Sequence, residues 1–244
     1  MEELDYFKKN IESQIKKAFD GNVVLFSFLD LSYGAILEKY AKKYKVPFYK
    51  YGHIINSERN RYILSYYDVS KDDFKIDLFK IKYNNKFASI NHRNVLGKLI
   101  SLGIERDSIG DIIFQGDDIF FAIKRELRSF ILNDFNEINN AKIELELVDI
   151  DIENIIKYED KNYFVSSLRL DCIISSIYNI SRNDTKNIII NGDVYINNIV
   201  CMNPITILKE NDIVSVRHKG KFKFTSINGK SRSDRFNVTL SRRI

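Results

Sequence analysis

Apolar residues recur at intervals of three or four near the start of the chain, at Leu4, Phe7, Ile11, Ile15 and Phe19. This spacing places them on one helix face and predicts a first amphipathic helix. A second helix is predicted over residues 33–44, and short β-like runs follow at residues 46–51 and 61–67. We therefore interpret residues 1–70 as a small N-terminal α/β domain.

A more regular succession of elements follows in residues 71–151. Asn91 provides a helix cap, and Gly103 lies where a glycine commonly ends a helix. The predicted order is a strand at 74–83, a helix at 95–102, a hairpin at 111–114 and 119–123, a helix at 124–135 and a strand at 142–148. This β-α-β-β-α-β order predicts a ferredoxin-like middle domain.

RNA-recognition modules share that topology and stack bases on aromatic residues of their central strands. The third predicted strand carries Phe120 and Phe121 but lacks the basic-glycine-aromatic core of such a module. Strand alternation requires one of the two rings to face the protein core. We therefore expect Phe120 and Phe121 to serve mainly in packing, and we treat base stacking on this sheet as the weaker interpretation.

Residues 152–166 are polar and acidic at first, and we interpret them as a connector with a short helix at 154–158. After it, Leu170, Ile173, Ile174 and Ile177 form one apolar helical stripe. Ser181 and Asp184 predict a capping box that opens a second helix. Alternating residues then predict strands at 194–196, 214–217 and 221–224. The overall fold class is α+β.

Net charge separates the chain into two parts. The 244 residues carry a net charge of +5, from 38 Lys and Arg against 33 Asp and Glu. Residues 167–244 hold 13 and 6 of these, a net +7, which leaves −2 for residues 1–166. A local cationic surplus on folded elements indicates a polyanionic partner.

The basic residues in this part follow structural spacing. Arg182 and Lys186 lie four apart on one helix face, where a shared anion would remove their repulsion. Lysines on strands can also protect an exposed sheet edge, which remains an alternative for part of the set. The candidate RNA-binding residues are Arg169, Ser181, Arg182, Lys186, Arg217, Lys219, Lys221 and Lys223.

Residues 168–244 resemble the S4 RNA-binding domain, a helix–helix–β module. The matching residues are Arg169-Leu170-Asp171, Ser181-Arg182, Lys186, Gly192, Val194, Ile196-Asn197, Asn211-Asp212 and Val216-Arg217. Asn198 and Asn211 stand where the family often has glycine, at turns where asparagine tolerates left-handed geometry. The resemblance implies docking of the two helices and the adjoining strand on structured RNA.

The rest of the chain resembles the YlmH family of bacterial RNA-binding proteins. The resemblance is carried by His92-Arg93-Asn94-Val95-Leu96-Gly97, Leu102-Gly103-Ile104-Glu105-Arg106, Ile109-Gly110-Asp111-Ile112, Phe28-Leu29-Asp30, Ser57-Glu58-Arg59 and the ending Lys219-Gly220-Lys221-Phe222 with Gly229-Lys230. The chain departs from the family at Leu31, His53 and Asn94, where proline, glycine and aspartate are expected. We name His92, Arg93 and Arg106 as an additional candidate interface.

This family resemblance implies a cytoplasmic, ribosome-associated protein that is not an enzyme. It implies binding to ribosomal RNA of the large subunit in quality control of stalled nascent chains, with peptidyl-tRNA and ribosome-associated proteins as further partners. The expected protein is a monomer without cofactor or metal. Cys172 and Cys201 lack metal-ligand spacing, the N-terminus is acidic rather than signal-like, and no apolar run reaches the ~20 residues of a membrane span.

The alternative function is an RNA-modifying enzyme or its accessory subunit. Arg169-Leu170-Asp171 resembles the catalytic triplet of pseudouridine synthases, but here it opens the S4-like region instead of lying in a synthase domain. No glycine pair forms the G-x-G of a methyltransferase-type loop. His53, His92 and His218 lie far apart in sequence and carry no metal or nucleophile motif.

Overall fold

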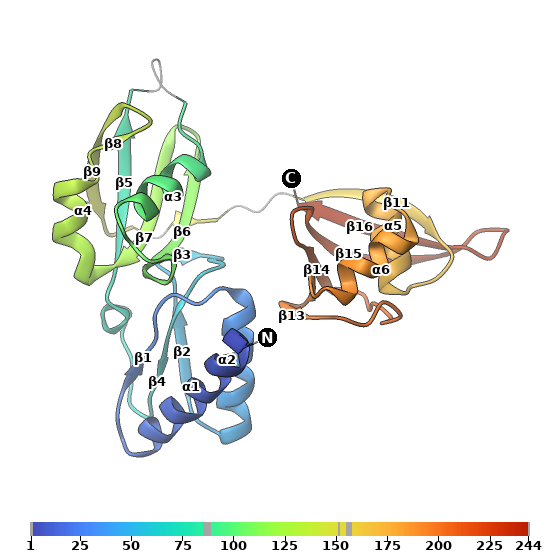
Figure 1. Ribbon diagram of the computed structural model, residues 1–244, viewed down its shortest axis with the longest axis horizontal. Helices are drawn as coiled ribbons and strands as arrows, with labels where there is room; N and C mark the ends of the chain where they lie inside the picture. The colour runs from blue at the N-terminus through green and yellow to red at the C-terminus, as the bar shows by residue number, and fades with distance from the viewer. Residues whose placement is uncertain (1, 85–88, 151, 155–157, 244) are drawn as a thin grey trace. The chain divides into compact units, whose positions relative to one another are not determined.

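A computed structural model describes residues 2–84, 89–150, 152–154 and 158–243, without the side chains of residues 2–4. By their internal contacts, the residues divide into two compact units, Met1–Ile155 and Ile156–Ile244. Each unit combines helices with antiparallel sheet (Figure 1), which gives the mixed α+β class expected from the sequence. No helix in the described part of the chain is both long and apolar enough to cross a bilayer.

The first unit begins with two helices against a small sheet. Helices α1 (Glu2–Phe19) and α2 (Leu31–Tyr44) pack on strands β1 (Val24–Leu25), β4 (Arg61–Leu64) and β2 (Phe48–Tyr51), which pair in that order. Asp30 caps α2, because its carboxylate accepts from the backbone N–H groups of Ser32 and Tyr33. The middle of the apolar stripe of α1 lies in this core, where Ile11 and Ile15 are buried and Phe7 is partly buried, whereas Phe19 at the helix end is exposed.

A five-stranded antiparallel sheet follows in the same unit, in the order β6-β7-β5-β9-β8. Its strands are β5 (Ile76–Tyr83), β6 (Ile109–Gln115), β7 (Asp118–Lys124), β8 (Glu137–Ile138) and β9 (Ala141–Val148). Helices α3 (His92–Ser101) and α4 (Arg128–Asp134) cover one face. The predicted order of strand, helix, hairpin, helix and strand is present, with the added short strand β8.

Helix ends in this sheet domain follow the sequence signals. Asn91 and Asn94 form a reciprocal capping box at the start of α3, and Gly103 follows its end with φ +82°. The predicted helix at 124–135 begins later than expected. Residues Arg125–Leu127 form a 3-10 turn, and α4 starts at Arg128. Arg125 and Arg128 both donate hydrogen bonds to the buried Asp77 carboxylate, and Arg128 Nε lies 2.6 Å from Asp77 Oδ2.

The sheet buries its helix-covered face and part of the opposite face. Phe121 is fully buried on the helix side, where its ring stacks on Phe79 at 5.5 Å between centroids. Phe120 faces the other side and is only 4% exposed, because it packs in a cluster with Phe28, Ile63 and other residues of the first part of the unit. The part of this face that carries Phe120, where RNA-recognition modules stack bases, is therefore occupied by the protein itself.

Polar contacts reinforce this junction. The Asp111 carboxylate of β6 accepts from the backbone N–H groups of Glu58 and Arg59, at 2.6 and 3.1 Å. The Arg59 guanidinium donates to the carbonyl oxygens of Phe28, Arg106 and Ile109. The Phe28 ring also packs directly on the Gly110 backbone, since a Cβ on Gly110 would lie 2.7 Å from this ring. Strand β10 (Ile152–Glu153) adds a parallel pairing with β3 (Ile54–Ile55).

The second unit is a helical pair on one face of a six-stranded sheet (Figure 1). The helices are α5 (Leu170–Tyr178) and α6 (Arg182–Ile190). The sheet order is β11-β16-β15-β14-β12-β13. These strands are Tyr158–Val165 (β11), Val194–Ile196 (β12), Ile199–Val200 (β13), Ile213–Val216 (β14), Gly220–Lys230 (β15) and Phe236–Arg243 (β16).

The interpretation of residues 152–166 as a connector is wrong for most of its length. Residues 158–165 form β11, which pairs with β16 in an unbroken antiparallel register from Tyr158↔Arg243 to Val165↔Phe236. This is a mostly exposed edge strand, so backbone pairing rather than a continuous apolar row holds it in place. The short helix predicted at 154–158 falls largely on residues 155–157, which lie outside the described part of the chain.

Candidate nucleic-acid interface

Helix α6 presents the central pair of candidate residues. Ser181 caps it by accepting from the Asp184 backbone N–H at 3.1 Å, and its hydroxyl donates to the Asp184 carboxylate. Thr185 and Ile189 are buried beneath the helix. Arg182 and Lys186 are therefore held on the exposed side, and within the described chain neither takes part in an ion pair.

The first turn of α5 lies beside Arg182. The Arg182 guanidinium donates to the Ser166 hydroxyl at 2.8 Å, and this hydroxyl lies 4.0 Å from the Cys172 sulfur. Arg169, the N-cap residue of α5, binds Asp171 through Nε at 3.1 Å and Nη2 at 2.6 Å. The structure thus brings Arg169, Arg182 and Lys186 to the helical side of the unit.

Asp171 orients Arg169 rather than offering a free carboxylate. Its side chain is 1% exposed, whereas that of Arg169 remains 37% exposed. Burial alone would raise the pKa of Asp171, but hydrogen bonds from Arg169 and Cys172 and the charge of Arg169 outweigh it and hold that pKa below its usual value. In this structure the Asp171 carboxylate is buried and paired, and it acts on the orientation of Arg169.

Asp171→Asn should flatten the acid side of the stability profile. Because the folded-state pKa of Asp171 is depressed, its contribution is present above the unfolded pKa and lost as pH falls through the folded value. At neutral pH we expect a loss of about 1.5–3 kcal/mol, the usual value of hydrogen bonds to a charged group. Thermal unfolding between neutral and acidic pH measures both effects. Asp234→Asn, at an 82% exposed carboxylate, is the matched control and should change little.

Lys221 and Lys223 occupy the other side of the sheet. Phe222 and Phe224 point into the core beneath the helices, so strand alternation turns the two lysines to the opposite face. Each apolar row is buried and each basic row is partly exposed, as the sequence predicted. The eight candidate residues nevertheless do not form one surface, because the sheet separates these lysines from Arg182 and Lys186.

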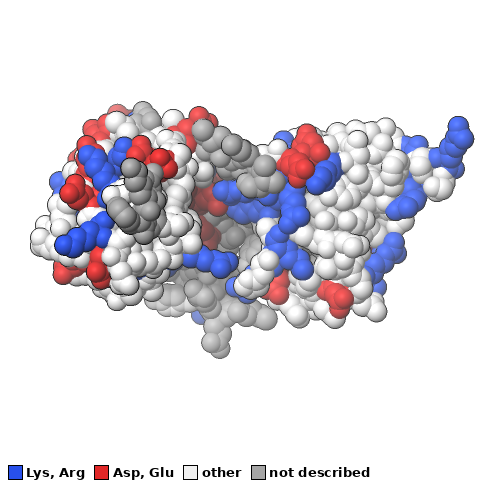
Figure 2. Space-filling model, turned by 90° about the horizontal axis from the view of Figure 1, so that it is seen from above, with Lys and Arg blue, Asp and Glu red and all other residues white. Residues whose placement is uncertain are grey.

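Arg217 and Lys219 lie at the turn between β14 and β15. The Arg217 guanidinium is 62% exposed and pairs with Asp193, with Nη1 and Oδ1 3.2 Å apart. Lys219 is partly exposed and closes the turn through its backbone N–H to Val216. Both lie near the end of α6, since Asp193 follows that helix. Figure 2 shows the Lys and Arg side chains of this unit in separate groups with uncharged surface between them.

One basic residue at the helical side was missed from the sequence. Arg242 lies with its guanidinium carbon 5.4 Å from the centre of the Tyr178 ring on α5. The Tyr178 hydroxyl donates to the Gly220 carbonyl, and burial is the main cause that raises its pKa to about 12. The pairing of β16 with β15 could have identified it. Arg242 lies directly opposite the core residue Phe222, so both side chains are on the sheet face that the helices cover.

The middle-domain candidates His92, Arg93 and Arg106 differ in their exposure and in their hydrogen-bond partners. Arg93 is exposed in the first turn of α3. The Arg106 guanidinium donates to the Ile109 carbonyl at 2.7 Å, and burial together with the charge of Arg59 lowers its pKa to about 10, which still leaves it cationic at neutral pH. Partial desolvation and the charge of Arg106 lower the pKa of His92, which makes it a weaker candidate for binding phosphate as a cation.

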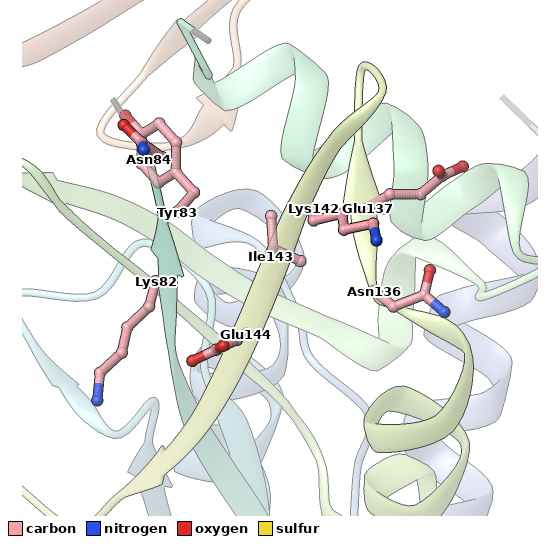
Figure 3. Close-up of a pocket in the computed structure, with 8 residues that line it drawn as sticks. All are labelled: Lys82, Tyr83, Asn84, Asn136, Glu137, Lys142, Ile143 and Glu144. Atoms are coloured by element: carbon pink, nitrogen blue, oxygen red, sulfur yellow. The ribbon is translucent and has the colours of Figure 1, made fainter. Parts of the chain in front are cut away.

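A further hollow of about 850 Å³ lies at one end of the five-stranded sheet (Figure 3). Its polar lining comes mainly from β5 and the β8–β9 hairpin, and it includes Lys82, Asn136, Lys142 and Glu144. Figure 3 shows these side chains pointing in different directions rather than converging. No cluster of three or more His, Cys, Asp or Glu able to hold a metal occurs among the residues that the structure describes.

Known proteins resemble this chain over most of its length. Residues 70–152 match the family described as "Putative RNA-binding domain in YlmH". The "Ribosome-associated protein quality control protein P2" of Bacillus subtilis (strain 168) is 32% identical over 222 residues, which cover 89% of this chain and 86% of that protein. The solved structure of "Cell division protein ylmH from Streptococcus pneumoniae" has a TM-score of 0.53 and 28% identity, and covers 60% of this chain and 92% of its own.

These matches agree with the resemblance found in the sequence motifs of residues 92–112. The relative from Bacillus subtilis is similar across far more than the middle domain, and the solved structure shares both fold and sequence. The chain therefore belongs to the YlmH family.

Proposed function

We propose that the protein binds RNA on the ribosome and serves in quality control of stalled nascent chains. The name of the Bacillus subtilis relative and the description of the matching family support the proposal. A role on ribosomes implies a cytoplasmic location.

We assign residues 167–244 to an S4 domain that docks on structured ribosomal RNA of the large subunit. The observation that carries this assignment is the exposed side of α6, where a capped and anchored helix holds Arg182 and Lys186 toward solvent. Arg169 and Arg242 extend the same helical side. Ser181 contributes indirectly, because it caps α6 and so fixes the helix that carries Arg182 and Lys186. Paired or fixed guanidinium groups favour planar, bidentate phosphate recognition.

The remaining candidates belong to a wider interface. Arg217 and Lys219 extend the contact past the end of α6, while Lys221 and Lys223 face a second RNA segment or solvent. Residues 1–70 and 71–151 then serve as two further domains that contact peptidyl-tRNA or ribosome-associated proteins, with Arg93 as the exposed contact. The protein works as a monomer.

We further propose that it acts by binding rather than by catalysis. Asp171 is the one residue whose sequence context resembles a catalytic motif, and it is buried against Arg169. Incubating the protein with ribosomal RNA, with and without S-adenosylmethionine, tests this. A new modified nucleotide in the mass spectrum would establish the RNA-modifying alternative.

Salt dependence tests the mode of binding. If phosphates supply most contacts, the logarithm of the association constant should fall linearly with the logarithm of salt concentration, by roughly 0.7–0.9 for each phosphate neutralised. Cosedimentation with isolated large subunits over a salt series measures the slope. A flat response would contradict electrostatic anchoring.

A further inference from the structure

A group of exposed apolar side chains lies at one end of the small N-terminal sheet. Phe19, Val23, Tyr66 and Tyr67 are 53%, 55%, 49% and 59% exposed. We call these four residues the aromatic edge. They lie outside the family match at residues 70–152 and outside the candidate interface of the second unit.

Contacts between segments distant in sequence bring these residues together. The rings of Phe19 and Tyr66 lie 6.2 Å apart at an angle of 36°. The Tyr67 hydroxyl lies 3.6 Å from the position of a Cβ on Gly21, in the turn after α1. Val23 precedes Val24, which pairs with Leu64 just before the tyrosines. The end of α1, the start of β1 and the end of β4 therefore meet here.

The backbone holds the two tyrosines at the surface. The Ser65 hydroxyl accepts from the Tyr67 backbone N–H at 2.9 Å and donates to the Tyr67 carbonyl at 3.1 Å. The Tyr66 hydroxyl makes a long contact of 3.5 Å to the Lys45 carbonyl. Rings that only sealed the hydrophobic core would be buried like Tyr62, which is 3% exposed on the preceding strand β4.

Exposed lysines lie on the segments that adjoin this edge. Both α1 and α2 end beside it, and the adjoining segments 16–23, 42–45 and 65–69 carry five exposed lysines against two exposed aspartates. These charges are Lys16, Lys17, Lys42, Lys43 and Lys45 against Asp20 and Asp68. Lysine also complements the negative end of a helix dipole, which explains part of the placement. It does not explain aromatic rings exposed among the lysines.

We propose that the aromatic edge is a second RNA-binding surface, which takes unpaired nucleotides by stacking their bases on Phe19, Tyr66 and Tyr67. Exposed aromatic rings bordered by cations are the arrangement that binds single-stranded nucleic acids, since every base has a face to stack and every nucleotide a phosphate. The surplus of lysines favours a nucleic acid, which carries a phosphate on each nucleotide, over a protein partner whose surface has few acidic residues. This inference goes beyond S4-type docking on structured RNA.

The test uses the full chain with Arg182→Glu and Lys186→Glu, which silences the helical side of the second unit. The probe is a fluorescein-labelled oligouridylate of about ten nucleotides, within the usual site size for single strands. The background protein should bind this probe in fluorescence anisotropy. Adding Phe19→Ala, Tyr66→Ala and Tyr67→Ala should weaken binding at least roughly tenfold, because each stacked base contributes about fivefold or more and three rings are removed.

Matched variants separate stacking and charge from unfolding. Tyr66→Phe with Tyr67→Phe keeps the rings and should keep binding, while Tyr6→Ala removes a 75% exposed ring elsewhere on α1 and should have no effect. Lys16→Glu with Lys17→Glu should weaken binding, whereas Lys8→Glu with Lys9→Glu, two turns earlier, should not. Ultraviolet crosslinking of the probe should map to peptides containing residues 19, 66 and 67.

Two outcomes would overturn the proposal. One is an aromatic-edge variant that is folded and binds the probe as tightly as the background protein. The other is a background protein that does not bind the probe at all. In the first of these outcomes, loss of a ribosomal protein partner by the same variant would identify the surface as a protein interface. Ribosome cosedimentation of the wild type and of the Arg182→Glu, Lys186→Glu variant reports separately on the proposed S4 docking.

Discussion

Replacing Arg182 and Lys186 together with glutamate should abolish cosedimentation with large ribosomal subunits. Each side chain is exposed on α6 and placed for a charge-assisted bond to phosphate. Such bonds are worth about 1.5–3 kcal/mol each. Losing two of them lowers affinity by roughly a hundredfold or more before the added repulsion between glutamate and phosphate is counted.

The structure predicts that this variant keeps its fold. The cap of α6 is made by Ser181 and Asp184, and the buried contacts are made by Thr185 and Ile189. Neither substituted residue contributes to them. Glutamate at position 182 is also favourable in the first turn of a helix. The double substitution does remove the hydrogen bond from Arg182 to Ser166, which lies at the exposed surface.

Binding isotherms on wild type and variant over a series of low salt concentrations, where electrostatic binding is strongest and residual affinity of the variant is measurable, give the decisive measurement. The slope should fall by about 1.4–1.8 if two phosphate contacts disappear. Lys8→Glu with Lys9→Glu changes the net charge of the chain equally and lies on α1, so it is the matched control and should bind nearly as wild type. Unchanged cosedimentation of a correctly folded double variant would contradict the assignment of this site.

Local signals in the sequence predicted the helix ends well. Asn91 and Ser181 cap the helices as expected, and Gly103 adopts positive φ. The departures from glycine within the family resemblance have a direct counterpart in the backbone. Asn198 and Asn211 have φ values of +67° and +73°. These features depend on a few neighbouring residues, which is why the sequence alone determines them.

His53 is a costlier departure of the same kind. It has φ +63° where glycine was expected, so the left-handed backbone is kept without the residue that favours it. Its Nδ1 atom is buried and lacks a hydrogen-bond partner among the described residues. The sequence identified the position as a departure from the family. The structure shows that a non-glycine residue adopts left-handed geometry there and that its buried nitrogen has no partner among the described residues, and both features are unfavourable.

Non-local pairing escaped prediction. The β11 segment is rich in charged and polar residues, so it lacks the alternation that marks a half-buried strand, and only pairing with β16 reveals it. Likewise, alternation showed that Lys221 and Lys223 are opposite to Phe222 and Phe224, but not which face the helices cover. That choice places the two lysines away from Arg182, and it depends on packing across the whole unit.

The fold also changes how the middle domain should be understood. Its strand order would suit base stacking on Phe120, yet that face packs against residues contributed by the first part of the chain. Arg59 and Arg106 likewise direct their donors to backbone carbonyls. The two parts of the first unit are therefore packed together through this face, and any RNA contact proposed for the unit would use its outer surfaces, such as the aromatic edge or the exposed turn at Arg93.

Phe120→Ala should cost stability and leave RNA binding intact. Truncating a buried phenylalanine typically destabilises a protein by about 3–5 kcal/mol, from reduced burial and the cavity left behind. Phe120 is 4% exposed and packs with Phe28, Ile63 and Phe74, so we expect the upper part of this range. Chemical denaturation measures the loss, and binding to large subunits is measured at a temperature where the variant remains folded.

Phe114→Ala is the comparison variant that distinguishes core packing from base stacking as the role of an aromatic residue on this sheet. Phe114 lies on the neighbouring strand β6 and is 40% exposed, so its removal should cost far less stability. If Phe120 stacked on a base, its variant would lose affinity in proportion to the stacking energy while the free energy of unfolding changed little. Because the ring is enclosed by protein on the side that RNA would have to approach, the reverse pattern is expected: a large loss of stability with an unchanged dissociation constant for the folded molecules.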